Sequence, residues 1–177
     1  MGYEFETMST DFDEKTIRHD DPEQLTLALA HAKADALLPH VSNDALVITA
    51  DTVVLCNGNI LEKPESPDEA RSFYKEYGVH PVIAVGAIVV TNTKTGIRVA
   101  GTDRVAIHLR PIPETVVEAL ISYGAIFNCA GGFTLWEPLL KDYINRVDGE
   151  VESAVGLSPT LTQRLIEEAR TPLENTL

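Results

Sequence analysis

Basic residues are scarce in this sequence. Its 14 lysine and arginine residues face 27 aspartate and glutamate residues, which gives a formal net charge of −13 at pH 7. Proteins that bind nucleic-acid polymers or anionic membranes need a basic face, so we expect no DNA, RNA or membrane partner. A small anionic ligand is still compatible with this charge, because a pocket can be locally basic on an acidic protein.

Cysteines and long apolar runs are scarce as well. Cys56 and Cys129 are the only cysteines, and they form no CxxC motif. The five histidines are scattered and lack the spacing of metal ligands. No apolar stretch approaches the roughly 20 residues that span a bilayer, and the start shows no signal-peptide pattern. These features predict a cytoplasmic chain with reduced thiols.

Apolar residues in regular patterns are abundant. They make up 44% of the 177 residues, a globular composition that suits one domain. Strand patterns and helix patterns alternate along the chain. The strands are predicted at 3–10, 46–55 and, around a Thr-Lys-Thr-Gly turn, within 81–109, and the helices start at 22, 67, 113 and 159. We therefore predict an α/β fold, with one domain over residues 1–177 and a mixed, twisted β-sheet flanked by helices.

Capping signals predict where two of the helices begin. Asp21 is a typical N-cap, and Pro22 suits the first helical position. The segment 66–69, Ser-Pro-Asp-Glu, reads as a capping box whose helix ends at Gly78. In the first helix, one apolar face is predicted from the helical spacing of Leu25, Leu29, Ala32 and Ala36.

One carboxylate, Asp51, interrupts the apolar strand pattern at 46–55. Burying an unpaired carboxylate costs several kcal/mol, so Asp51 must lie at a solvated strand end, form an ion pair or bind a metal. The hairpin turn signal Asn57-Gly58 follows, and the return segment ends in Lys63, which the hairpin brings towards the strand of Asp51. Two interpretations remain open: a strand-end residue that accepts hydrogen bonds from turn amides, or a functional carboxylate.

Three further charged residues each allow a plain and a functional interpretation. Lys63 forms an ordinary ion pair or binds phosphate. Lys33 lies between two alanines and either extends from the rim of the helix towards water or binds phosphate. Glu14, in the charged trio 13–15, belongs to a solvated turn or binds a metal. Carboxylates for a divalent metal and lysines for phosphates together suit phosphoryl chemistry.

Several short motifs occur in the order of the Maf family, and the chain resembles these nucleotide pyrophosphatases over nearly its whole length. ADTVV, which holds Asp51, and ILEKP, which holds Lys63, form a fairly specific pair. The segment NCAGGFTLWEPLL resembles plant and other eukaryotic members more than the bacterial dTTP/UTP type. The remaining motifs are Asp13-Glu14-Lys15, AHAKAD around Lys33, SPDEA, CAGG and the late VGL.

This resemblance implies an elongated α/β domain with a deep central cleft, similar to inosine triphosphate pyrophosphatases and often dimeric. It implies hydrolysis of a nucleoside triphosphate to the monophosphate and pyrophosphate, with Mg²⁺ or Mn²⁺ as cofactor. Asp51 would activate water or join the metal site, and Glu14 would help to bind the metal. Lys33 and Lys63 would hold the phosphates.

The sequence departs from the family pattern at its start. Family members open with a strand and a Ser-x-Ser-x-x-Arg-Arg loop that grips the triphosphate, whereas this sequence begins at what would be the second strand. Either the gene model is short, or this form lacks part of its phosphate cradle. In the second case the chain would be a catalytically impaired nucleotide-binding or interaction module, because charged donors to phosphate contribute strongly to binding and catalysis.

A second departure concerns Trp136, which stands where the family usually has Gln or Glu, with Glu137 after it. One interpretation places the indole at the mouth of the cleft, where it stacks on a purine or modified base. Glu137 would then accept hydrogen bonds from a guanine edge. The other interpretation makes Trp136 a hydrophobic plug against Pro138 and Leu139.

Overall fold

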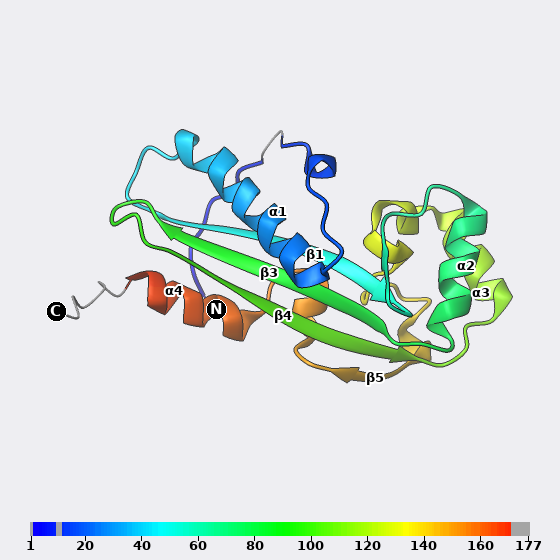
Figure 1. The fold of residues 1–177 in the computed structure, drawn as a ribbon. Helices are drawn as coiled ribbons and strands as arrows, with labels where there is room; N and C mark the ends of the chain where they lie inside the picture. The colour runs from blue at the N-terminus through cyan, green and yellow to red at the C-terminus, as the bar shows by residue number, and fades with distance from the viewer. Residues whose placement is uncertain (1, 10–11, 171–177) are drawn as a thin grey trace. The chain divides into compact units, whose positions relative to one another are not determined.

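The described part of the chain, residues 2–9 and 12–170, contains four α-helices and five strands in the computed structural model (Figure 1). The α/β class predicted from the sequence is confirmed. The helices are α1 (Pro22–Leu37), α2 (Pro67–Tyr77), α3 (Glu114–Tyr123) and α4 (Pro159–Arg170). The strands are β1 (Leu46–Cys56), β2 (Asn59–Leu61), β3 (Val82–Asn92), β4 (Arg98–Leu109) and β5 (Ile144–Asp148).

The five strands form one sheet in the order β2-β1-β3-β4-β5. The β1–β2 and β4–β5 pairs are antiparallel, and the arrows of neighbouring strands point in opposite directions in Figure 1. The sheet is therefore antiparallel, where we predicted a mixed one. For the β1–β2 pair the reason is the short connection, because a two-residue turn joins only antiparallel strands. Asn57 and Gly58 form such a turn, with φ of 50° and 78°.

The described residues divide into two compact units. The first, which we call the α1/α4 unit, consists of the described residues within Met1–Asp51, Gly86–Asp103 and Gly156–Leu177. The second, which we call the α2/α3 unit, consists of Thr52–Val85 and Arg104–Val155. No helix within the described ranges is long and apolar enough to cross a membrane. The single domain over residues 1–177 stays a prediction.

Strand β3 is buried on both faces within the α1/α4 unit. Ala87 and Val89 pack with Ala30 and Ala34 of α1. The alternate residues of β3 pack on the other face against α4, in a cluster of Ile88, Val90, Leu161, Leu165, Ile166 and Ala169. Figure 1 shows α1 and α4 on opposite sides of β3. This double burial explains why the β3 sequence is an almost continuous apolar run.

The core of the α2/α3 unit is built around aromatic side chains of α2. Tyr74 and Tyr77 are 2% and 1% exposed, and Tyr77 meets Phe133 edge to face with 5.9 Å between ring centroids. Helices α2 and α3 are joined at their surface by Arg71, whose Nε donates to Glu118 Oε1 at 2.6 Å. The unit therefore has a core of its own, separate from the β3 clusters of the α1/α4 unit.

The predicted helix starts at 22, 67 and 159 are confirmed, whereas α3 begins at Glu114, with Pro113 as its N-cap, one residue later than predicted. Asp21 accepts hydrogen bonds from the N–H groups of Glu23 and Gln24 at 2.8 and 3.1 Å. Ser66 accepts one from the N–H of Glu69 at 3.2 Å, and α2 ends at Gly78 as expected. The predicted apolar face of α1 is partly wrong, because the helix turns Ala30 and Ala34 fully inward and leaves two of the predicted residues, Ala32 and Ala36, half-buried.

The strand predicted at 3–10 is also wrong for its described residues, 3–9, which form no strand. The apolar residues of this alternating pattern are not buried: Phe5 is 81% exposed and Tyr3 is 42% exposed. Residue 10 lies outside the described residues. Strand β5 was not predicted, because Ile144–Asp148 is short and mostly polar, with only Ile144 and Val147 apolar.

Candidate active site

Strand β1 and helix α1 bring Asp51 and Lys33 together in the α1/α4 unit. Successive strand residues alternate between faces, so Asp51 lies on the same face as Thr49. That face is turned to α1, because Thr49 Oγ1 donates to the carbonyl of Ala30 at 2.7 Å. Lys33 follows Ala30 by nearly one helical turn and therefore projects from the same side of α1.

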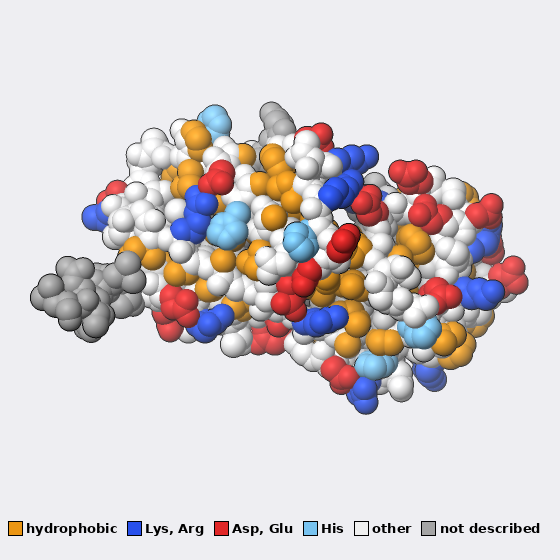
Figure 2. All heavy atoms as spheres, viewed as in Figure 1, with side chains coloured by type: hydrophobic (Ala, Val, Ile, Leu, Met, Phe, Trp, Pro, Cys, Tyr) orange, Lys and Arg blue, Asp and Glu red, His pale blue; other side chains and the backbone are white. Residues whose placement is uncertain are grey.

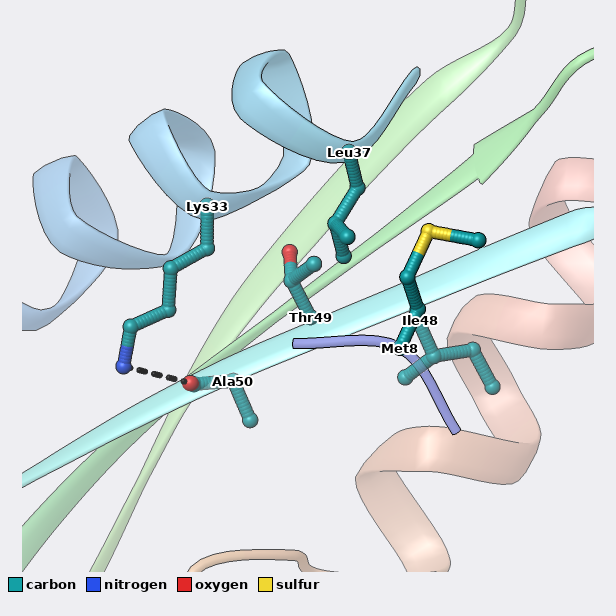
Figure 3. Close-up of a pocket in the computed structure, with 6 residues that line it drawn as sticks. All are labelled: Met8, Lys33, Leu37, Ile48, Thr49 and Ala50. Atoms are coloured by element: carbon teal, nitrogen blue, oxygen red, sulfur yellow. Dashed lines mark hydrogen bonds between the residues drawn. The ribbon is translucent and has the colours of Figure 1, made fainter. Parts of the chain in front are cut away.

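The Lys33 ammonium is bound by two carboxylates. Its Nζ lies 2.6 Å from Asp51 Oδ1 and 2.9 Å from Glu14 Oε1, and 3.5 Å from the carbonyl of Ala50. Figure 3 shows the lysine reaching from α1 to this carbonyl on β1. Glu14 comes from a short 3₁₀ turn, Glu14–Thr16, which Asp13 caps by accepting the N–H of Lys15 at 3.1 Å. We call Glu14, Lys33 and Asp51 the lysine triad.

The geometry of the lysine triad contradicts the plain interpretations of Asp51 and Lys33. Asp51 lies inside β1, pairs with Lys33 of α1 and is 9% exposed at its side chain, so it is not a strand-end residue bonded to turn amides. Lys33 is 21% exposed and ends on carboxylates, so it is not a rim lysine that reaches water. Glu14 is 55% exposed and forms the open side of the triad.

Burial sets the electrostatics of the triad. It raises the pKa of Asp51, Lys33 opposes this rise, and the charge of Glu14 adds to it, so the pKa lies above its usual value. For Lys33, burial alone lowers the pKa, but the hydrogen bonds that it donates to Asp51 and Glu14, together with their charges, outweigh this effect and the pKa is raised. The raised pKa favours the protonated ammonium, and the oxygens of two carboxylates, Asp51 and Glu14, face it.

The donor set fits a divalent metal that arrives with a phosphate ligand. Among residues 2–9 and 12–170, no group of three or more His, Cys, Asp or Glu side chains is arranged to hold a metal ion. Asp51 and Glu14 nevertheless place oxygens around one point, the Nζ of Lys33. Mg²⁺ is usually held by one or two carboxylates together with substrate phosphates, and an all-protein cage is unusual for it.

A shallow hollow of about 210 Å³ lies beside the triad (Figure 3). In Figure 3 Leu37 lies on α1 above the strand, and Met8 lies beside Ile48. The hollow is smaller than the roughly 300–1,000 Å³ of typical small-molecule sites, so it does not by itself enclose a nucleotide. Its lining consists of Met8, Lys33, Leu37, Ile48, Thr49 and Ala50.

The other predicted site residues belong to the α2/α3 unit. Lys63 is exposed and lies two residues beyond the end of β2. Trp136 is 65% exposed, which contradicts its interpretation as a hydrophobic plug. Glu137 is 8% exposed and accepts the N–H of Leu139 at 3.2 Å through Oε1. The roles assigned to these residues stay predictions.

Two residues that the sequence did not suggest have marked contacts in this unit. Tyr74 and Tyr77 donate their buried hydroxyls to the carbonyls of Gly132 and Gly131. The available signal was weak: two tyrosines three residues apart on one helix face, and a pair of glycines far along the chain. Nothing in the sequence connects these two features, because the contact spans more than 50 residues.

Charged side chains of both signs are mixed over the visible surface. On the face shown in Figure 2, lysine and arginine side chains occur in small groups among aspartate and glutamate side chains. This distribution agrees with the acidic composition of the chain. The expectation of no nucleic-acid partner stays a prediction.

Comparison with known proteins identifies the family. The model of the family described as Maf-like protein matches residues 1–169. A 7-methyl-GTP pyrophosphatase of Dictyostelium discoideum is 43% identical over 175 residues, which cover 95% of this chain and 88% of the relative.

Bacterial relatives are more distant. A 7-methyl-GTP pyrophosphatase of Vibrio vulnificus is 30% identical, covering 75% of this chain and 68% of the relative. A dTTP/UTP pyrophosphatase of Geotalea uraniireducens is 28% identical, covering 88% of this chain and 79% of the relative. The family match extends over nearly the whole sequence and includes every residue of the lysine triad, and the chain therefore belongs to the Maf-like protein family.

Proposed function

We propose that this chain hydrolyses nucleoside triphosphates to nucleoside monophosphates and pyrophosphate, assisted by a divalent metal ion. The observation that carries the proposal is the lysine triad: a nearly buried Asp51, 2.6 Å from Lys33, with Glu14 2.9 Å from the same ammonium. Relatives named as nucleoside triphosphate pyrophosphatases support this reaction class.

Asp51 acts as the general base in this proposal. Burial raises the pKa of Asp51, which makes it a better proton acceptor than an ordinary aspartate. It takes a proton from water, and the water oxygen attacks the α-phosphorus. The bond from this phosphorus to the bridging oxygen breaks, and pyrophosphate leaves with the bond electrons.

Lys33 neutralises negative charge in the proposed site. It has three N–H donors, and in the structure they face Asp51, Glu14 and, at 3.5 Å, the carbonyl of Ala50. A phosphate must therefore compete with the carboxylates for the ammonium. A divalent ion held by Asp51 and Glu14 would neutralise charge on the phosphate oxygens and would replace Lys33 as the counter-charge of the two carboxylates. Lys63 is the second phosphate-binding lysine of the proposal.

We propose 7-methyl-GTP as the first substrate to test. The support is the name of the Dictyostelium relative, 43% identical over 95% of this chain, together with the exposed indole of Trp136. A base stacked on an aromatic ring gains about 1–3 kcal/mol, and the positive charge of 7-methylguanine adds a cation–π contribution. Glu137 would accept hydrogen bonds from the donors on the guanine edge.

The test uses the purified chain with Mg²⁺ or Mn²⁺ and four substrates: 7-methyl-GTP, GTP, UTP and dTTP. Pyrophosphate release from at least one of them supports the proposal. Binding without release from any of them would instead assign the chain as a non-catalytic nucleotide-binding module. In the Trp136→Ala variant, the preference for 7-methyl-GTP over UTP should fall about tenfold. Unchanged ratios among the four substrates would remove Trp136 from base recognition.

A homodimer is a further part of the proposal, because the family resemblance implies it. Sedimentation equilibrium at micromolar concentration measures the mass directly. A monomer mass at every concentration would overturn this part and leave the hydrolytic proposal untouched.

A further inference from the structure

Two buried tyrosine hydroxyls bind one loop of the α2/α3 unit. Tyr74 Oη donates to the carbonyl of Gly132 at 2.7 Å, and Tyr77 Oη donates to the carbonyl of Gly131. The two rings meet edge to face, with 5.3 Å between their centroids. Burial raises the pKa of both phenols, so both remain protonated donors at neutral pH.

The same loop contacts the segment that carries Lys63. The N–H of Gly131 donates to the carbonyl of Glu62 at 2.9 Å. A Cβ placed on Gly132 would lie 3.2 Å from Cγ of Pro64, so the loop and the segment that carries Lys63 are in close contact there. Glu62 and Pro64 are the neighbours of Lys63 on either side. The loop therefore holds the chain directly before and directly after the lysine.

The packing between the tyrosines and the loop leaves no free space. Gly131 and Gly132 have φ of 63° and 59°, a region that other residues rarely adopt. A Cβ on Gly131 would meet Tyr77 Oη at 2.7 Å and Cγ1 of Val54 at 2.8 Å. A shift of the tyrosines must therefore move the loop, and a moved loop loses its contacts with Glu62 and Pro64.

We propose that Tyr74 and Tyr77 are positioning residues for Lys63: their hydroxyls fix the Gly131–Gly132 loop, and the loop fixes the backbone from which Lys63 reaches a phosphate. This inference rests on the phosphate-binding role proposed for Lys63. A lysine has a long flexible stem, and ordering it on a ligand costs side-chain entropy. A backbone that is already fixed on both sides limits the further ordering that binding requires.

The first test is a double-mutant cycle with inorganic pyrophosphate and Mg²⁺ as the probe, measured by calorimetry. Tyr77→Phe keeps the ring and removes the hydrogen bond, and it should weaken pyrophosphate binding about 3- to 10-fold. In a Lys63→Ala background, the same substitution should have no further effect. Tyr123→Phe is the matched control, because it removes the hydroxyl of a tyrosine that is 75% exposed, and its affinity should equal that of the wild type.

The second test follows the loop without any ligand. Tyr77→Phe should increase hydrogen exchange at the amide of Gly131, which donates to Glu62, and Tyr123→Phe should not. A full effect of Tyr77→Phe in the Lys63→Ala background would overturn the inference, because the tyrosine would then act independently of the lysine. Unchanged exchange at Gly131 would overturn it as well.

Failure of the proposed function gives a different result. It shows in the wild type, which would then neither bind pyrophosphate nor release it from any triphosphate, and this outcome overturns both proposals. Failure of the positioning role alone shows only in the variants of an active wild type. If Lys63→Ala binds pyrophosphate with wild-type affinity, Lys63 does not bind the phosphate. This outcome overturns the positioning role and leaves the hydrolytic activity of the wild type unaffected.

Discussion

Asp51 is nearly buried and forms a short ion pair with Lys33. Replacing it tests whether this carboxylate contributes to kcat more than to the affinity for nucleotide. Asp51→Asn keeps the shape of the side chain but removes the proton acceptor. We expect kcat to fall about 10²- to 10⁴-fold, the usual contribution of general base catalysis, with a much smaller change in the affinity for nucleotide. Steady-state kinetics and calorimetric binding measure the two quantities.

The matched control for this variant is Asp44→Asn. Asp44 also pairs with a lysine, Lys94, at 3.0 Å, but its side chain is 67% exposed. This control should leave kcat unchanged, since surface ion pairs contribute little. Full activity of Asp51→Asn would exclude Asp51 as the base.

Lys33 competes with metal ions for the carboxylates of the triad, which gives a second prediction. Lys33→Met keeps the apolar stem and removes the charge between Asp51 and Glu14. Without nucleotide, Mn²⁺ should bind about tenfold more tightly, while a triphosphate should bind more weakly. Electron paramagnetic resonance of free Mn²⁺ gives the metal affinity, and Lys94→Met, at a 71% exposed lysine, is the control. Unchanged Mn²⁺ affinity would show that the ammonium and the metal do not share a site.

At the residue scale, the sequence predicted candidates better than it predicted their contacts. The single acid in an apolar strand pointed to Asp51, because an unpaired carboxylate is costly there. The pairing with Lys33 was not predictable from helical spacing alone, because it depends on which face of α1 turns to β1. Glu14 was assigned a role only through the family resemblance, because nothing in a short polar turn indicates what it contacts.

Among the elements, the loop of Gly131 has no room for an added methyl group. Gly131→Ala would place Cβ 2.7 Å from Tyr77 Oη and would keep φ at 63°. Gly96→Ala is the matched control, because Gly96 has φ of 75° but nothing within 4 Å of the added Cβ. Strain alone costs about 1–2 kcal/mol, so we expect that loss for Gly96→Ala and at least about 2 kcal/mol more for Gly131→Ala. Urea unfolding measures both, and equal losses would mean that the loop yields without cost.

Helix α2 should make the fold sensitive to alkaline pH. Burial, helped by the charge of Glu137, raises the pKa of Tyr74 above its ordinary value of 10.0, and burial raises that of Tyr77. A raised folded-state pKa contributes stability that is complete below pH 10 and is lost as the pH rises towards the folded-state value. The free energy of unfolding should therefore fall above pH 10. In the Tyr74→Phe/Tyr77→Phe variant, this slope should be shallower, by up to about 1.4 kcal/mol per pH unit for each tyrosine.

The measurement is urea unfolding between pH 9 and 11.5. Tyr123→Phe, at a side chain that is 75% exposed, is the matched control and should retain the wild-type slope. An identical slope in the double variant would show that the two phenols do not titrate differently in the folded and unfolded states.

Elements with local signals were predicted well, and elements without them were not. Asp21, Pro22 and Ser66 marked helix starts, and Asn57-Gly58 marked a hairpin, because caps and tight turns depend on a few adjacent residues. Strand β5 was missed because its pairing with β4 is a long-range contact. The strand predicted at 3–10 is wrong for the described residues 3–9, because an alternating pattern forms a strand only where a neighbouring strand pairs with it.

The whole molecule carries a net charge of −13, which affects how it meets an anionic substrate. A triphosphate approaching an acidic protein is repelled at low ionic strength, and salt shortens the range of this repulsion to about 10 Å at 0.1 M. We therefore expect kcat/KM to rise between 10 and 100 mM KCl at saturating Mg²⁺. A steady fall over this range would indicate a locally basic entrance that outweighs the net charge.

Strand β3 sets a limit on how the gene for this chain can change. Alanines at 30, 34 and 87 let α1 lie close to the strand, whereas the opposite face takes larger side chains from α4. One codon inserted directly after Ala87 would exchange the two faces of the strand beyond it, place Ile88 opposite the alanines of α1, and lift Lys33 away from Asp51. Insertions and deletions should therefore be tolerated in the turn at 93–96 but not within the strand. The length of this strand should be more strictly conserved than the identity of its residues.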